Sequence, residues 1–184
     1  MFSRDEEEHI VETKRILYAK MKMLLGQFPE VLRDFLTHNS ILTGGSIATH
    51  LLHAGEPNDY DLYLNSENHI LFFKQYVTNM DKEFIQDADE KYYDVSVPGK
   101  LVTANATTFK NRIQVVTIHN SNVRNTFDFV HCMPWYDIAK NKLHISYNQY
   151  DSISLKKLIK NEHPNAFPLS GKRVDKYNAR GWKF

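Results

Sequence analysis

Residues 41–64 read ILTGGSIATHLLHAGEPNDYDLYL, and this stretch carries most of the information about the fold. Its first residues, 41–43, form a short apolar run that predicts a strand, and the glycine pair that follows breaks that run. Residues 46–54 then predict a helix, and after a turn residues 60–64 predict a second strand. A strand, a tight turn, a helix and a further strand in so short a space predict an α+β fold with a mixed sheet.

The glycine pair at the strand-to-helix junction is suited to binding phosphate. Gly44 and Gly45 have no side chains, so backbone N–H groups there can approach a phosphate closely, and the N-terminus of the following helix adds partial positive charge. Ser46 can donate its hydroxyl to the same group. We therefore expect a triphosphate to lie across these three residues.

Two aspartates follow on the second predicted strand. Asp59 and Asp61 are two positions apart, so their side chains project from the same face while Tyr60 points to the other. Two carboxylates this close repel each other unless a cation lies between them, and their hard oxygen ligands suit Mg²⁺ or Mn²⁺. We expect two such ions, bridging a triphosphate and stabilising the pyrophosphate leaving group.

A third carboxylate is expected to complete this metal site. Asp128 lies in an apolar run, in a predicted strand over residues 126–132, where an aspartate between phenylalanines needs a partner to offset its burial. The sequence therefore predicts that Asp128 meets Asp59 and Asp61.

These residues resemble the polymerase-β-like nucleotidyltransferase superfamily, in which a GG or GS begins a helix, a DxD lies on the next strand and an acidic residue follows later. The resemblance covers residues 41–64 and reaches Asp128. It implies transfer of a nucleoside monophosphate from an NTP to RNA, a protein or a small molecule, with divalent metal. Many members carry arginine or serine where this chain has Asn58, which leaves the subfamily open.

The roles implied by the resemblance follow residue by residue. Gly45 and Ser46 would hold the triphosphate, Asp59 and Asp61 would bind metal, and Asp128 would act as a ligand or base.

The C-terminal part of the chain is basic. Residues 152–184 hold eight Lys and Arg against two Asp and Glu, a net charge of +6, while the remainder carries −5 and the whole chain +1. A basic tail on an acidic body favours contact with a polyanion such as an NTP or an RNA backbone.

A predicted helix over residues 172–180 gathers part of this charge. Arg173, Lys176, Tyr177 and Arg180 follow i, i+3, i+4, i+7 spacing and share one face. The basic side chains of that face could bind a triphosphate, or the tyrosine could stack on a base. The alternative is that the face is solvated and the tyrosine half-buried.

The rest of the chain is predicted to form helices and strands that support the site. We expect one domain over residues 1–184, with a helical part at 1–40, a catalytic core at 41–150 and the basic tail at 151–184. Helices are predicted over 4–27, from Pro29 to about 39, from 66 to about 76, and over the basic segment 155–161. Strands are predicted near 92–96, 101–108, 112–118 and 126–132, with a hairpin over 135–146 that turns at Asn141.

Several classes of protein are excluded. No apolar run approaches the roughly 20 residues that cross a bilayer, and the acidic start is unlike a signal peptide, so we expect a cytoplasmic protein without membrane contact. A single cysteine, Cys132, excludes an intramolecular disulfide and is a poor basis for a zinc site. The frequent Lys and Asn are typical of AT-rich genomes, including viral ones.

The sequence thus predicts a metal-dependent nucleotidyltransferase that uses an NTP. A catalytically inactive nucleotide-binding or regulatory module of the same fold is the alternative, although two repelling carboxylates have no evident purpose there. A toxin-like enzyme that modifies tRNA or a host protein is a version of the first hypothesis. The sequence specifies neither the nucleotide, the acceptor nor the oligomeric state.

Overall fold

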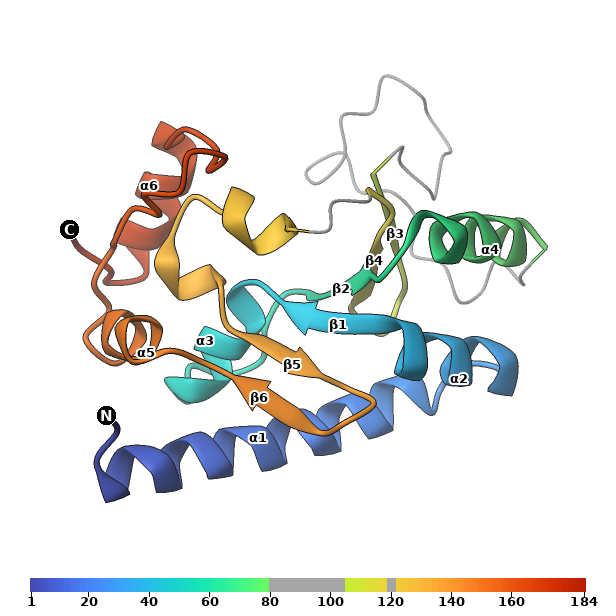
Figure 1. Cartoon of the computed structure of the whole chain (residues 1–184), viewed down its shortest axis with the longest axis horizontal. Coiled ribbons are helices and arrows are strands. Elements are labelled where there is room, and N and C mark those ends of the chain that lie inside the picture. Colours follow the sequence, from blue (N-terminus) through green and yellow to red (C-terminus); the bar gives the residue numbers. More distant parts are fainter. Residues whose placement is uncertain (80–104, 119–121) are drawn as a thin grey trace.

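The computed structural model describes residues 1–79, 105–118 and 122–184 of the chain (Figure 1). This part forms six α-helices and an open, mixed sheet of six strands, so the predicted α+β class is confirmed. The predicted strand near 92–96 and the beginning of the one predicted at 101–108 lie outside the described residues. None of the helices in these three ranges is long and apolar enough to span a bilayer.

Three of the six helices in the described ranges begin at a serine that caps them. The helices are α1 (Arg4–Leu25), α2 (Glu30–Asn39), α3 (Gly45–Leu51), α4 (Glu67–Thr78), α5 (Tyr147–Ser154) and α6 (Gly171–Ala179). Ser3 caps α1 in a reciprocal capping box with Glu6, and Ser146 does the same for α5 with Gln149. Ser66 accepts a hydrogen bond at the start of α4. These local signals explain why the predicted starts of α1 and α4 agree closely with the structure, and α2 begins directly after Pro29, as predicted.

The sheet has the strand order β3-β4-β2-β1-β5-β6. Its strands are β1 (Ser40–Thr43), β2 (Tyr60–Leu64), β3 (Ala106–Thr108), β4 (Ile113–Val116), β5 (Trp135–Asp137) and β6 (Lys142–His144). β2 and β4 run parallel and every other pair is antiparallel. The predicted hairpin is confirmed as β5 and β6, with Asn141 in the turn at a φ of 49°.

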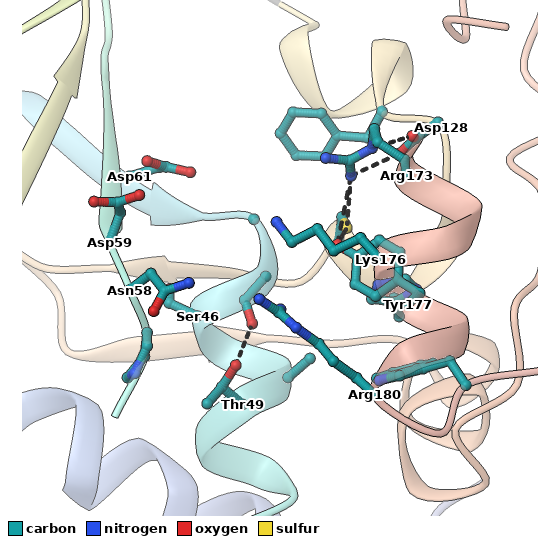
Figure 2. A pocket seen from close by; sticks show the side chains of 18 of the residues that line it. Ser46, Thr49, Asn58, Asp59, Asp61, Asp128, Arg173, Lys176, Tyr177 and Arg180 are labelled. Carbon is teal, nitrogen blue, oxygen red and sulfur yellow. Dashed lines mark hydrogen bonds and ion pairs between the residues drawn. The ribbon is translucent and has the colours of Figure 1, made fainter. Parts of the chain in front are cut away.

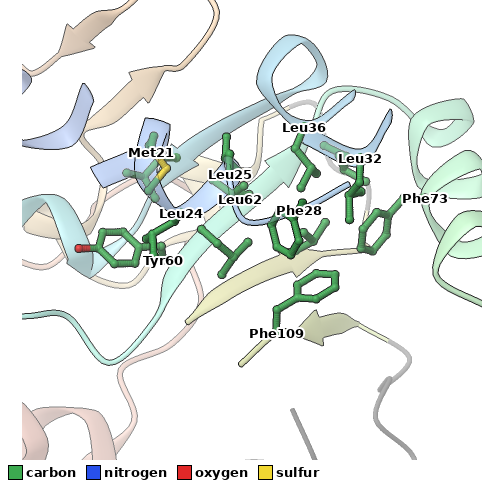
Figure 3. Packing of buried hydrophobic residues seen from close by; sticks show 14 of the residues in the cluster. Met21, Leu24, Leu25, Phe28, Leu32, Leu36, Tyr60, Leu62, Phe73 and Phe109 are labelled. Atoms are coloured by element: carbon green, nitrogen blue, oxygen red, sulfur yellow. The ribbon is translucent and has the colours of Figure 1, made fainter. Parts of the chain in front are cut away.

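One face of the sheet is covered by α1, α2 and α4 (Figures 1 and 3). Alternate residues of β2, namely Tyr60, Leu62 and Leu64, are buried in this core. Its members include Leu17, Met21, Leu32, Leu36, Leu42, Tyr60, Leu62, Phe73 and Phe109. Because side chains alternate along a strand, Asp61 and Tyr63 must lie on the opposite face of β2.

A second hydrophobic cluster joins the C-terminal part of the chain to α3. It contains Ala48, Leu51, Phe129, Cys132, Tyr150, Ile153, Leu158, Tyr177 and Trp182. Figure 1 shows α5 and α6, in orange and red, beside α3 and away from α4. The packing brings α6 to the side of the sheet that carries Asp61.

The predicted strand at 126–132 is wrong. Two 3₁₀ turns, η2 (Val123–Thr126) and η3 (Val130–Cys132), occupy this segment, and only Phe129 forms an isolated bridge, with Lys160. The side-chain amide of Asn161 donates to the backbone carbonyls of Asn125 and Phe127. The backbone N–H of Asn161 donates to the backbone carbonyl of Asp128. The backbone groups are thus satisfied by a distant segment rather than by a neighbouring strand.

The basic helix predicted at 155–161 is also wrong. α5 ends before it, and Lys156 takes a φ of 48°, which a continuing helix does not allow. The backbone N–H of Leu158 donates to the carbonyl of Lys183, and the N–H of Lys183 donates to the carbonyl of Lys156. Pairing with the C-terminus therefore holds this segment extended.

Candidate functional site

A pocket of about 860 Å³ opens between the first turn of α3, the start of β2 and α6 (Figure 2). All the residues predicted for the site line it. They are Gly44, Gly45, Ser46, Asp59, Asp61, Asp128, Arg173, Lys176, Tyr177 and Arg180. The fold therefore brings together side chains that are more than a hundred residues apart in the sequence.

The glycine turn lies directly against the acidic pair. Gly44 has a φ of 107°, a conformation that favours glycine, and its N–H donates to the carbonyl of Cys132 at 3.1 Å. A Cβ added at Gly44 would lie 3.4 Å from Oδ2 of Asp61. The backbone at this turn is thus close enough to Asp61 for one ligand to contact both.

Ser46 offers an unused polar atom at the same turn. Its Oγ is buried and has no hydrogen-bond partner within the described ranges. A buried hydroxyl without a partner costs free energy, and a ligand oxygen in the pocket would remove that cost. α3 has only seven residues, so the backbone amides and this hydroxyl matter more here than the helix dipole expected from the sequence.

The acidic pair projects from one face of β2, as the spacing predicted. Figure 2 shows the carboxylates of Asp59 and Asp61 side by side on the wall opposite α6. Burial and then the charge of Asp59 raise the pKa of Asp61 to about 7. Burial also raises the pKa of Asp59, against the opposing charges of Lys176 and Arg112. Both carboxylates therefore gain from a nearby cation.

The opposite wall supplies positive charge from α6. Lys176 extends toward the acidic pair, and Arg180 extends toward the first turn of α3 (Figure 2). Burial and then the charges of Arg180 and Arg173 lower the pKa of Lys176. The face is not merely solvated, because Tyr177 is buried in the second cluster and the cations beside it line the pocket.

Asp128 lines the pocket but does not meet the other two aspartates. Both carboxylate oxygens accept hydrogen bonds from Arg173, one of them from Nη2 at 3.0 Å, on the α6 side of the pocket (Figure 2). Within the described ranges no three His, Cys, Asp or Glu side chains gather closely enough to hold a metal ion. The predicted convergence of three carboxylates is therefore not observed. Asp128 does have the partner that its burial requires, but the partner is a guanidinium.

Sequence reasoning missed several residues of the pocket. Lys156 lines it and donates from Nζ to the carbonyl of Arg180 at 3.2 Å. Arg112, the residue before β4, is not among the lining residues and donates from Nη1 to the carbonyl of Pro57 at 3.0 Å, but its positive charge opposes the raised pKa of Asp59. Lys156 belongs to the basic segment predicted at 155–161, whereas no local pattern marks Arg112. Tyr63 was detectable, because it continues the two-residue spacing of Asp59 and Asp61.

Comparison with family models gives a match over residues 15–156, most of the chain, to the family described as Gabija anti-defense 2 family protein. The chain belongs to the Gad2 family. No nucleotidyltransferase family matches, so the predicted membership in the polymerase-β-like superfamily is wrong. No curated protein and no solved structure matches the chain significantly.

The Gad2 match includes the glycine turn, the acidic pair and Asp128 but ends before α6. The GG and DxD spacing is therefore found here in a chain of the Gad2 family. What the site does must be argued from its own geometry.

Proposed function

We propose that this Gad2-family protein is a metal-dependent nucleotidyltransferase that transfers an NMP from an NTP to an acceptor. One observation carries the proposal. One pocket holds two carboxylates at the start of β2 beside a glycine turn and opposite the cationic side chains of α6, and the buried serine hydroxyl at this turn has no hydrogen-bond partner among the described residues. Acidic ligands for a metal and basic groups for phosphates are the two requirements of phosphoryl-transfer chemistry.

The donor set fits Mg²⁺ or Mn²⁺. Asp59 and Asp61 would hold the metal, because hard carboxylate oxygens suit these ions, and burial and then the charge of Asp59 raise the pKa of Asp61, so that a bound cation would stabilise its charged form. When bound, the metal would supply charge neutralisation at the phosphates and activation of the attacking hydroxyl. Two protein carboxylates are compatible with Mg²⁺, which usually binds through one or two of them together with water and substrate phosphate.

The chain's own residues would bind and orient the triphosphate. The hydroxyl of Ser46 and the backbone of the glycine turn face it from one side, and Lys176 and Arg180 face it from the other. In the transfer, the acceptor oxygen bonds to the α-phosphorus, the bond to the bridging oxygen breaks and pyrophosphate leaves. The hydroxyl proton goes to water. Charge then grows on the leaving group, where Lys176 and Arg180 stabilise it.

A second function, nucleotide binding without transfer, is favoured by one observation. Asp128, the expected third carboxylate, is bound by Arg173. In this alternative the pocket would hold an NTP as a regulatory ligand. The acceptor distinguishes the two functions, since only the transferase modifies RNA or a protein.

Replacing Asp59 and Asp61 together by asparagine should reduce transfer of labelled NMP by about a thousand-fold or more, because several kcal/mol of transition-state stabilisation are lost. The measurement is label transfer from each α-labelled NTP to RNA and protein acceptors, together with pyrophosphate release. Asp34→Asn, an exposed change on α2, serves as the control. Full activity of the double variant would refute metal-dependent transfer at this pair. NTP binding without pyrophosphate release in the unmodified protein would favour the second function.

The family description places relatives in anti-defense against Gabija, and we propose this role for the chain, exerted in the cytoplasm of a cell that carries Gabija. The transferase activity would then be the means of anti-defense. Expression of the unmodified protein should remove the protection that Gabija gives, whereas the double Asp→Asn variant should not. If the unmodified protein and the double variant removed the protection equally, anti-defense would not depend on the acidic pair of the pocket.

A further inference from the structure

One end of the pocket is aromatic. Tyr63 lies on the same face of β2 as Asp61, two residues further along, and the ring of Phe127 lies 5.9 Å from its ring. Phe167 also lines the pocket, although it is 63% exposed. We call Tyr63, Phe127 and Phe167 the aromatic end. It adjoins the acidic pair, because Asp61 and Tyr63 are separated by about 7 Å along the strand.

Hydrogen bonds hold the aromatic end in place. The N–H of Phe167 donates to the carbonyl of Thr126 at 2.9 Å, which ties the loop before α6 to η2. The buried side chain of Asn161 donates to the carbonyls of Asn125 and Phe127 at 3.0 and 2.9 Å. Phe167 is therefore a large apolar side chain whose backbone is fixed at the pocket while most of its surface faces solvent. Its ring is therefore held at the pocket and is accessible to a ligand there.

The remaining lining holds most of the cations together with the rings of His131, Tyr177 and Trp182, which are buried. Arg180 extends toward the first turn of α3 and Lys176 toward the acidic pair, and this part of the pocket suits phosphates. The aromatic end offers ring faces and edges instead. An NTP has the same division, since its phosphates are anionic and its base is a flat π-system.

We propose that the aromatic end binds the nucleobase of the NTP by stacking. The inference rests on the proposed function, because it assigns one part of the same substrate to one part of the same pocket. Every base has a π-face, so all four NTPs should bind, and the larger rings of ATP and GTP should bind more tightly than those of CTP and UTP.

The test is calorimetry with the full-length protein and Mg²⁺, using ATP, UTP and inorganic tripolyphosphate, which has phosphates but no base. Phe167→Ala should weaken ATP binding by about five- to a hundred-fold, the range for loss of one base–aromatic stack, and should leave tripolyphosphate binding unchanged. Phe167→Trp should retain ATP affinity. Phe72→Ala, which removes a partly exposed ring from α4 away from the pocket, should match the unmodified protein.

The outcomes separate this inference from the proposed function. Unchanged ATP affinity in both Phe167→Ala and Phe127→Leu would overturn the inference alone, even if transfer to the acceptor fell. An equal loss of affinity for ATP and for tripolyphosphate would also overturn the inference. In that case the rings would affect phosphate binding or the stability of the fold and would not contact the base. If the unmodified protein bound neither ligand, both proposals would fail.

Discussion

Gly44 shows how a single residue shapes the pocket. Its φ of 107° is a conformation that side chains rarely adopt, and Asp61 lies directly beside it. Gly55 has a similar φ of 87°, but a Cβ there would meet nothing within 4 Å. The two glycines therefore share the backbone requirement and differ in what surrounds them.

Alanine at either glycine should lower the free energy of unfolding by about 1–3 kcal/mol, the cost of a strained backbone residue. Only Gly44→Ala should also weaken NTP binding, because its methyl group enters the space beside Asp61. Thermal unfolding and calorimetry with an NTP measure the two effects. Wild-type NTP affinity in Gly44→Ala would show that the nucleotide does not approach this turn.

His131 is a buried residue with an electrostatic consequence. Neither ring nitrogen has a hydrogen-bond partner in the described part of the chain, and the ring lies 4.2 Å from that of Trp182 and 4.5 Å from that of Tyr177. Burial and then the charge of Arg173 lower the pKa of His131 to about 3, with Asp128 opposing. The folded protein therefore keeps this histidine neutral at pH values where the unfolded chain is protonated.

The contribution of His131 to stability should decrease as the pH falls from 6.5 toward 3, whereas the raised pKa of Asp61 gives a contribution of opposite sign as the pH falls below about 7. In that window the unfolded chain binds a proton at His131 that the folded chain does not, so this contribution is complete above pH 6.5 and falls by about 1.4 kcal/mol per pH unit. His131→Phe should remove this part of the pH dependence, so its stability should fall less steeply toward acid than that of the unmodified protein, and His38→Phe, at an exposed position, should keep the pH dependence of the unmodified protein. Urea unfolding at pH 7, 6, 5 and 4.5 measures it. An unchanged slope in His131→Phe would assign the acid sensitivity to other groups.

At the scale of elements, the ion pair of Asp128 and Arg173 attaches α6 to the segment between η2 and η3. Asp128 is 7% exposed at its side chain and Arg173 is 41% exposed, so the carboxylate is the more deeply buried partner. Nη2 of Arg173 also donates to the hydroxyl of Tyr177 at 3.4 Å. Through this pair, α6 holds Lys176 and Arg180 toward the pocket.

Arg173→Ala should destabilise the protein by about 3–5 kcal/mol, because it leaves a buried carboxylate unpaired. Asp128→Asn should cost less, since the amide remains a hydrogen-bond acceptor, and the double variant should recover much of the loss. A double-mutant cycle by urea unfolding measures this coupling. The exposed pair Arg33 and Asp34 provides the control, with an expected coupling below about 1 kcal/mol.

The same variants test the catalytic role predicted for Asp128. If Asp128 only holds Arg173, Asp128→Asn should keep transfer within about tenfold of the unmodified protein, since one hydrogen bond to a charged group is weakened. A loss as complete as that of the Asp59 and Asp61 double variant would instead make Asp128 a metal ligand or base, as the sequence predicted.

At the scale of the whole molecule, two hydrophobic clusters define where the pocket lies. The first joins α1, α2 and α4 to one face of the sheet, and the second joins α3 to α5 and α6. The pocket forms where the uncovered face of β2 meets the second cluster. The basic C-terminal part thereby faces the acidic pair, so the charge asymmetry seen in the sequence becomes a charge difference across one pocket.

The sequence by itself determined the features that depend on near neighbours. Alternation places Asp59 and Asp61 on one strand face, the glycine pair ends β1, and capping serines begin α1 and α4. The helical face of Arg173, Lys176 and Arg180 was also predictable, because i, i+3 and i+4 positions always share a side of a helix.

Only the tertiary structure decided which of these faces meet. Asp128 is paired with a residue 45 positions away, and residues 126–132 and 155–161 are shaped by Asn161 and the C-terminus rather than by their own periodicity. Local patterns carry no information about such partners, because the free energy of a buried ion pair or a satisfied carbonyl depends on what packs beside it. The acidic pair and the glycine turn were therefore predictable, whereas the partner of Asp128 and the enclosure of the pocket were not.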